Sequence, residues 1–255
     1  MKHTQNNQKN IIKYLTILII IFTAMAGLFL GTAQSHWAKP DIQELEEAEV
    51  YIEWNSTDND YGIQFFWDCE GFTTMAVINE RGKAALLVRT SSNLRAQGLT
   101  EGFFESVEPT VEDLSMDEFL ERFPEGTYRF LGWSTEGEWL VGETEFTHDL
   151  PYPPELNLEE FNLDDPTIMW TQPPGDAVVV EYEVVVELVV SEEGEDERVF
   201  VNTAVFPGNA NEFTVSPEFI DLIEDSEDAG ILKVEIIARE ESGNKTITEE
   251  EVDLE

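Results

Sequence analysis

The stretch VVVEYEVVVELVV, from Val178 to Val190, decides the fold of this 255-residue chain. β-branched residues dominate it, Tyr182, Val184 and Val186 stand at every second position, and Glu181, Glu183 and Glu187 occupy alternate positions. Residues two apart share one face of a strand, so this pattern places one face in a core and the other in water. The stretch therefore predicts a long β-strand. The same alternation recurs along the chain and predicts a mainly β protein.

The segments around this strand have the spacing of a β-sandwich, in which short strands alternate with regular turns. They are TIMWTQPPGD with Trp170, RVFVNTAVF, NEFTVSPEFI, ILKVEIIARE with the hairpin ESGNKT, and ITEEEVDL. In this order, residues 151–255 resemble a fibronectin type III domain. The resemblance implies a two-sheet sandwich with Trp170 and Tyr182 in its core. Leu232 stands where that family usually has a tyrosine, so its corner hydrogen bond is expected to be absent.

The first half also alternates, and it predicts a second sandwich-like domain over residues 48–150 that resembles no family we recognise. The expected strands cover Ala48–Trp54, Tyr61–Trp67, Met75–Val77, Ala84–Val88, Thr127–Trp133 and Trp139–Phe146. A short helix is expected near 117–123, because Ser115 and Glu118 form a capping box and Pro124 ends the segment. Three prolines within 149–154 mark the boundary between the two domains.

The N-terminal segment predicts export. Residues 1–33 contain no acidic residue, and a lysine-containing leader precedes 17 uncharged residues and then Gly31-Thr32-Ala33. This is the order of a secretory signal peptide cleaved after Ala33. An uncleaved membrane anchor is the alternative left open. Residues 34–47 are expected to form an acidic spacer with one helical turn. The expected location is secreted, periplasmic or cell-envelope.

The charge of the chain limits its partners. It has 54 acidic and 14 basic residues, a net charge of −40. Removing the three lysines of the leader takes the net charge to −43. Such a charge repels nucleic acid and anionic membrane surfaces, and it suits a saline environment and a bacterial source. Cys69 is the sole cysteine, so no internal disulfide forms, and the thiol is expected in a turn over 68–71.

The sequence favours a non-enzymatic protein. Beyond the leader only His36 and His148 remain for acid–base or nucleophilic chemistry, and no nucleophile motif accompanies them. A carboxylate-pair hydrolase stays open, because so many acids make any pair conceivable. No cofactor is expected apart from calcium. The turn with Asn55, Asp58 and Asp60 is its candidate site, although its spacing is not that of an EF-hand.

Tryptophans suggest a second kind of site. Trp133 and Trp139 flank the turn of the last hairpin in the first half, where exposed rings would stack on sugars. The leading hypothesis is a non-catalytic binding, adhesion or scaffold protein with a protein or glycan partner. The alternatives are a carbohydrate-binding module in the first half and a carboxylate-pair hydrolase. No membrane contact is expected beyond the N-terminal anchor.

Overall fold

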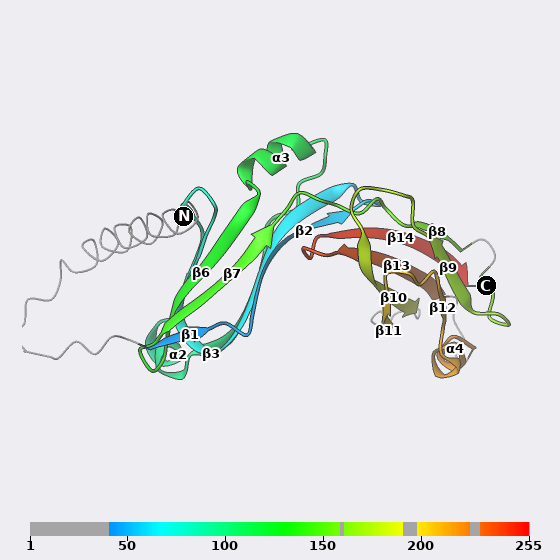
Figure 1. Cartoon of the computed structure of the whole chain (residues 1–255). Coiled ribbons are helices and arrows are strands. Elements are labelled where there is room, and N and C mark those ends of the chain that lie inside the picture. The colour runs from blue at the N-terminus through cyan, green and yellow to red at the C-terminus, as the bar shows by residue number, and fades with distance from the viewer. Residues whose placement is uncertain (1–40, 159–160, 191–197, 225–229, 255) are drawn as a thin grey trace, which may run out of the picture. The chain divides into compact units, whose positions relative to one another are not determined.

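The computed structural model describes residues 41–158, 161–190, 198–224 and 230–254 (Figure 1). The expected signal peptide over 1–33, its cleavage site and His36 lie outside the described residues. The described part is mainly β, as the alternation predicts. None of its helices has both the length and the apolar character that a membrane crossing requires.

The second half is a two-sheet β-sandwich. One sheet has the order β12-β9-β8, and the other runs β14-β13-β10-β11 at one end of a larger sheet. Their inward faces enclose one core, to which the helix α4 also contributes. The bounds are β8 Glu155–Asn157, β9 Thr167–Thr171, β10 Val179–Val190, β11 Arg198–Pro207, β12 Glu212–Thr214, α4 Pro217–Glu224, β13 Gly230–Glu240 and β14 Lys245–Leu254.

The core of this sandwich confirms the expected placement of its aromatic residues. Trp170 is 3% exposed and Tyr182 is 1% exposed, and their ring centroids lie 5.3 Å apart in an edge-on contact. Leu232 is fully buried and is paired with Leu188 across β13 and β10. One expectation is wrong. The end of NEFTVSPEFI forms α4 rather than strand, and Phe219 and Ile220 on this helix are buried in the core.

The first half has two layers that share one strand. Strand β3 pairs with β2 and β5 over its first part, and with β4 and β6 over its second part. Register shifts between Asp68 and Thr74, together with Gly71 at a φ of 128°, interrupt the strand between the two parts. The bounds are β1 Ile42–Glu44, β2 Glu47–Asn55, β3 Asp60–Ile78, β4 Ala84–Arg89, β5 Leu99–Glu105, β6 Gly126–Ser134 and β7 Trp139–Phe146.

Trp67 lies at the centre of the core between these layers. It is fully buried, stacks on Phe104 at 5.2 Å, and contacts Phe72 and Phe130 at 5.5 and 6.0 Å. A Cβ at Gly102 would stand 2.3 Å from its ring, so glycine is what lets β5 approach the indole. The core of the first half thus depends on one aromatic cluster.

Cys69 corrects the sequence analysis. Residues 68–71 were expected to form a turn that carries the thiol, but they belong to the 19-residue strand β3. Cys69 is 2% exposed within the core, and burial raises the pKa of its thiol. The polar letters Asp-Cys-Glu-Gly suggest a turn, but they mark the interruption at which β3 changes its partners.

Local sequence signals predicted one helix correctly but missed a second helix and the first strand. Helix α3, Met116–Arg122, confirms the expected helix, and its N-cap Ser115 accepts a hydrogen bond from the Glu118 amide at 3.3 Å. Helix α2, Ser92–Gln97, was not expected. The helical turn expected within 34–47 is wrong for 42–44, which form β1 and pair in parallel with β7.

The two halves are joined by backbone pairing and by one buried amide. Strand β14 pairs in parallel with β2, from Lys245 opposite Glu53 to Ile247 opposite Asn55. Asn244 is fully buried; its Oδ1 accepts the Ile52 amide at 2.8 Å, and its Nδ2 donates to the carbonyls of residues 147 and 149. Each half has its own core cluster. The division into domains at 48–150 and 151–255 stays a prediction.

Candidate functional site

The hairpin of β6 and β7 brings Trp133 and Trp139 together. The two residues are directly paired across the strands, and their ring centroids lie 4.1 Å apart with 33° between the planes. Both side chains are half-buried on the outer side of the sheet, because Phe130 and Leu140 fill the core on the inner side. Each ring therefore covers part of its neighbour, and the two do not form a coplanar row.

The tryptophan pair belongs to a wider apolar surface. Register connects it through β7 to Ile42 on β1, which is 61% exposed. The next row of cross-strand neighbours begins at Leu87 on β4, which is 67% exposed. It crosses β3 and β6 and ends on the outward side of β7. We call this surface the aromatic face, and its members are Ile42, Leu87, Leu131, Trp133, Trp139 and Val141.

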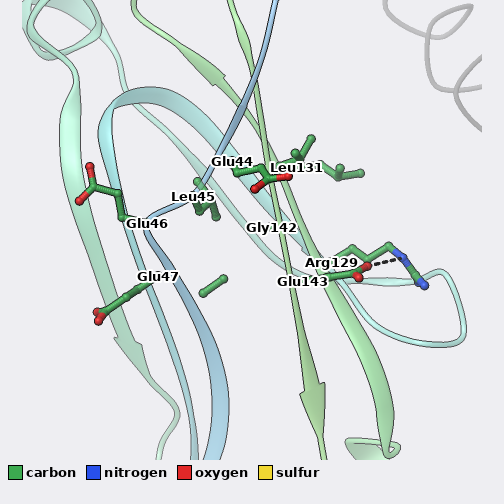
Figure 2. Close-up of a pocket in the computed structure, with 10 residues that line it drawn as sticks. Glu44, Leu45, Glu46, Glu47, Arg129, Leu131, Gly142 and Glu143 are labelled. Atoms are coloured by element: carbon green, nitrogen blue, oxygen red, sulfur yellow. Dashed lines mark ion pairs between the residues drawn. The ribbon is translucent and has the colours of Figure 1, made fainter.

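An acidic hollow adjoins the aromatic face (Figure 2). It has a volume of about 490 Å³, and Leu131 and Val141 line it together with Leu45, Ala48 and Gly142. Its charged residues are Glu44, Glu46, Glu47, Glu143 and Arg129. Arg129 Nε lies 3.9 Å from Glu143 Oε2, so this ion pair offsets part of the negative charge of the hollow. The hollow suits a cationic group carried on an apolar stem.

The structure also places the residues of the predicted calcium turn. Asn55 Oδ1 accepts the amides of Thr57 and Asp58 at 3.0 and 3.2 Å, and Asn55 Nδ2 donates to Asp58 Oδ2 at 3.2 Å. Burial, followed by the nearby Asp58 charge, raises the pKa of the Asp60 carboxyl. The amide oxygen of Asn55 is thus used in forming the turn. Calcium binding by Asn55, Asp58 and Asp60 stays a prediction, tested by thermal unfolding with calcium and with chelator.

Three glutamates that the sequence analysis did not single out meet on the outer side of the first half. Glu53, Glu105 and Glu108 bring carboxylate oxygens within 4.8 Å of one another. Gln64 Nε2 donates to Glu105 Oε1 at 2.9 Å, and Lys245 Nζ lies 3.9 Å from Glu53 Oε2. We call these three residues the glutamate trio. Glu53 is distant in sequence from Glu105 and Glu108, so only the pairing of β2, β3 and β5 could have revealed the trio.

Burial raises the pKa of two members of the trio, Glu53 and Glu108. Desolvation raises the pKa of Glu108 to about 7, and the charges of Glu105, Asp60 and Glu53 add to this shift. Glu108 also packs closely over β3, where a Cβ at Gly62 would meet its Cγ at 3.0 Å. The trio is therefore a crowded surface cluster in which the pKa of the Glu108 carboxyl lies close to neutral pH.

His148 is held in a structural contact. Its Nε2 lies 2.7 Å from the carbonyl oxygen of Phe123, and its ring meets Phe146 edge-on at 5.6 Å. Its backbone amide donates to Glu125 Oε1 at 3.0 Å. The imidazole nitrogen that faces Phe123 is engaged with the segment after α3.

Comparisons with known proteins give no relative by sequence. No protein-family model and no curated protein sequence matches the chain. Solved structures that resemble it include a tetra-tandem repeat from the extending region of a large adhesion protein, with 11% identity, 82% of this chain covered, 50% of that chain covered and a TM-score of 0.25. The chain thus spans about half of that structure.

Two further structures resemble the chain to a similar degree. A 1.5-MDa bacterial ice-binding adhesin matches at 12% identity, covering 84% of this chain and 65% of that one, with a TM-score of 0.24. A two-domain fibronectin type III segment of chicken tenascin matches at 11% identity, covering 83% and 98%, with a TM-score of 0.25. TM-scores this low carry no argument, so fold and function are argued from this chain's own residues.

Proposed function

We propose that this chain is an exported, non-catalytic binding protein that holds a partner protein on its aromatic face. The observation that carries the proposal is the set of outward-facing apolar side chains on β1, β4, β6 and β7, centred on the pair of Trp133 and Trp139. Folding needs only the inward positions of these strands to be apolar. An exposed apolar surface of this kind is typical of a site for another macromolecule.

The chemistry of the surroundings indicates a partner with apolar and basic side chains. The acidic hollow lies at the edge of the aromatic face and shares Leu131 and Val141 with it. A lysine or arginine of the partner would place its charge beside Glu44 and Glu143, which lie on the Leu131 side of the hollow in Figure 2, while its aliphatic part contacts the shared apolar wall. The overall charge of −40 favours such a partner at long range as well.

The location follows from the N-terminal sequence and from the composition. Export by a signal peptide cleaved after Ala33, with an uncleaved anchor as the alternative, would place the chain in the cell envelope or outside the cell. An adhesion or scaffold role fits a chain built of β-sandwiches. We assign the sandwich of residues 151–255 to the fibronectin type III type, on the order of its strands and the buried Trp170.

A glycan partner is the second candidate, favoured by the tryptophan pair alone. The rings of Trp133 and Trp139 stack on each other at 4.1 Å, which leaves less ring surface for a sugar than two separate coplanar rings would. The aliphatic members of the face, such as Leu87 and Ile42, offer a sugar no hydrogen bond. A partner protein can contact both the tryptophan rings and these aliphatic side chains.

Selection of displayed peptides tests the proposal. A random peptide library is panned on the chain and then on the double variant Trp133→Ser/Trp139→Ser, with Phe103→Ser as the matched control. Phe103 is 53% exposed on β5, outside the aromatic face. We expect enriched peptides with aromatic or aliphatic residues beside lysine or arginine, lost on the double variant and kept on the control. Peptides that bind all three proteins equally would refute the proposal.

Two parallel measurements separate the alternatives. On a glycan array, binding that is lost in the double variant would replace the protein partner with a sugar. In a panel of glycoside and ester substrates, turnover that disappears in Glu105→Gln or Glu108→Gln would establish the hydrolase that the sequence left open. Each variant replaces one carboxylate oxygen with an amide nitrogen and keeps the size of the side chain.

A further inference from the structure

Strand β11 has an open edge that is unusual for this chain. All ten of its residues pair with β10 on one side, and among the residues that the structure describes no strand pairs with its other side. Its sequence, RVFVNTAVFP, contains no acidic residue in a chain that has 54 of them. Exposed edges of native sheets are usually short or interrupted by charges, because an unpaired edge can add a further strand.

The opposite end of the same sheet shows the usual protection. There the edge strand β1 is three residues long and includes Glu44. By contrast, β11 exposes Val199, Val201 and Val205 on its outer side, at 52, 55 and 60%. The residues between them face inward, where Phe200 and Phe206 pack against the core. The open edge is therefore long, β-branched and uncharged between its two end residues.

The sequence of β11 is nearly symmetric about Thr203. Read outward from Thr203, both directions meet a small or amide side chain, then valine, then phenylalanine. In an antiparallel pair of two identical strands centred on Thr203, Val201 would oppose Val205 and Phe200 would oppose Phe206. This register keeps the valines on the outer side and the phenylalanines on the inner side. Valine pairs, aromatic pairs and a central threonine pair all stabilise adjacent strands.

We propose that β11 is a self-association edge, at which two copies of this chain pair antiparallel about a two-fold axis through Thr203. The occupant is a second copy because the symmetry of the strand matches the symmetry of an isologous contact. The sheet that ends in β14-β13-β10-β11 in one copy then continues through the contact into the same sheet of the other copy. This association is independent of the aromatic face, which lies on other strands.

The charge of the chain sets a condition on this contact. Two chains with a net charge of −40 each repel, and salt screens that repulsion. The uncharged edge offers a place where backbone groups can pair without bringing side-chain carboxylates together. The dimer is therefore expected to tighten as the salt concentration rises.

Disulfide trapping tests the register. In the proposed dimer the two Thr203 residues face each other at a Cα separation of about 4.5–5.5 Å, which a disulfide can bridge. Two Val199 residues would lie far apart, since each opposes Pro207 of the other copy. The purified chain bearing Thr203→Cys is compared with Val199→Cys after mild oxidation at low and high salt. Both positions are exposed on the same side of the same strand, and the native Cys69 is buried.

The outcomes decide the proposal. We expect a covalent dimer from Thr203→Cys that increases with salt, and little from Val199→Cys. Equal cross-linking of both variants would mean random collision or another register, and cross-linking of neither would mean that the edge stays open; either result overturns the proposal.

Sedimentation of the chain without added cysteines gives a second measurement. The double variant Val201→Glu/Val205→Glu would place glutamates opposite each other, and we expect it to weaken the dimer by more than roughly tenfold. Ile231→Glu, on the same outer face but on β13, should leave the dimer intact. A chain that sediments as a monomer at every salt concentration would also overturn the proposal.

Discussion

The two halves of the described chain build their cores alike and differ in what they present to the outside. Trp67 anchors the core of the first half and Trp170 that of the second, and both are buried. On the outer side, β10, β13 and β14 carry ion pairs, such as Lys233 with Glu235 and Glu249 at 3.1 and 2.8 Å. The aromatic face of the first half carries tryptophans and leucine instead.

This difference separates what folding requires from what function requires. Inward apolar positions are needed in both halves, because burying them is the main source of stability. The ion pairs on β13 and β14 of the second half show that outward positions can be charged without harm to a core. The apolar outward residues of the first half are therefore not required by its β-structure, and this is the basis on which we propose a binding role for them.

The largest expected effects come from the two core tryptophans. Trp67→Ala and Trp170→Ala should each lower the free energy of unfolding by about 3–5 kcal/mol, because each leaves a large cavity. Calorimetry of both variants sharpens the comparison of the halves. If the halves are separate domains, each substitution lowers the melting of its own half. A single transition lowered equally by either substitution would show that the halves unfold together.

Asn244, which joins the halves, should have the next largest effect. Asn244→Ala removes the acceptor of the buried Ile52 amide and should cost about 1–3 kcal/mol, measured by denaturant unfolding. Asn209→Ala, in the exposed turn after β11, is the control and should cost little. An effect of Asn244→Ala no greater than that of the control would mean that the junction adds nothing to stability.

The features of the fold and of the candidate site that could be predicted from the sequence are those that depend on residues close to one another in the chain. Alternation predicted most strands. The predicted hairpin placed Trp133 and Trp139 next to each other, one at each end of its turn. The capping box predicted α3. These signals lie within a few residues of the feature they predict, which is why they succeed.

Features that need distant partners were missed. Cys69 lies in a segment whose residues suggest a turn, and the pairing of Asp68 and Phe72, on either side of it, with β5 keeps the segment in β3. Strand β1 depends on β7, almost a hundred residues later. The glutamate trio requires the register of β2, β3 and β5 at once. Helix α4 is a different case, because the local start signals Ser216, which accepts the Phe219 amide, and Pro217 at the first helical position were overlooked.

The glutamate trio predicts a pH dependence of intermediate size. The folded state raises the pKa of Glu108 to about 7, above the ordinary value near 4.5. Folding thus favours the protonated carboxyl, so its contribution to stability is complete below about pH 4.5 and is lost as the pH rises through 7. Because Glu108 is exposed to screening water, we expect only about 1–2 kcal/mol between these limits.

Replacing the carboxyl tests this explanation. Glu108→Gln should be more stable than the unsubstituted chain at pH 8 and should lose much of the dependence between pH 5 and 8, measured by unfolding at each pH. Glu101→Gln, an exposed glutamate on the same strand as Glu105, is the matched control and should keep the dependence. An identical pH profile for both variants would show that the trio is not the cause.

The smallest expected effect on stability belongs to the residue with the largest expected effect on binding. Trp133 is half-buried, and its closest aromatic contact is Trp139 at 4.1 Å. Trp133→Ala should lose this pair interaction, about 0.5–1.5 kcal/mol, without opening a cavity in the core. The same substitution at Trp67 should cost several times more. If Trp133→Ala destabilised the chain as much as Trp67→Ala, measured by the same denaturant titration, the aromatic face would be part of the folding core, and the contrast between the halves would fail. If its cost is small while peptide binding is lost, this tryptophan is retained for a partner and not for the fold.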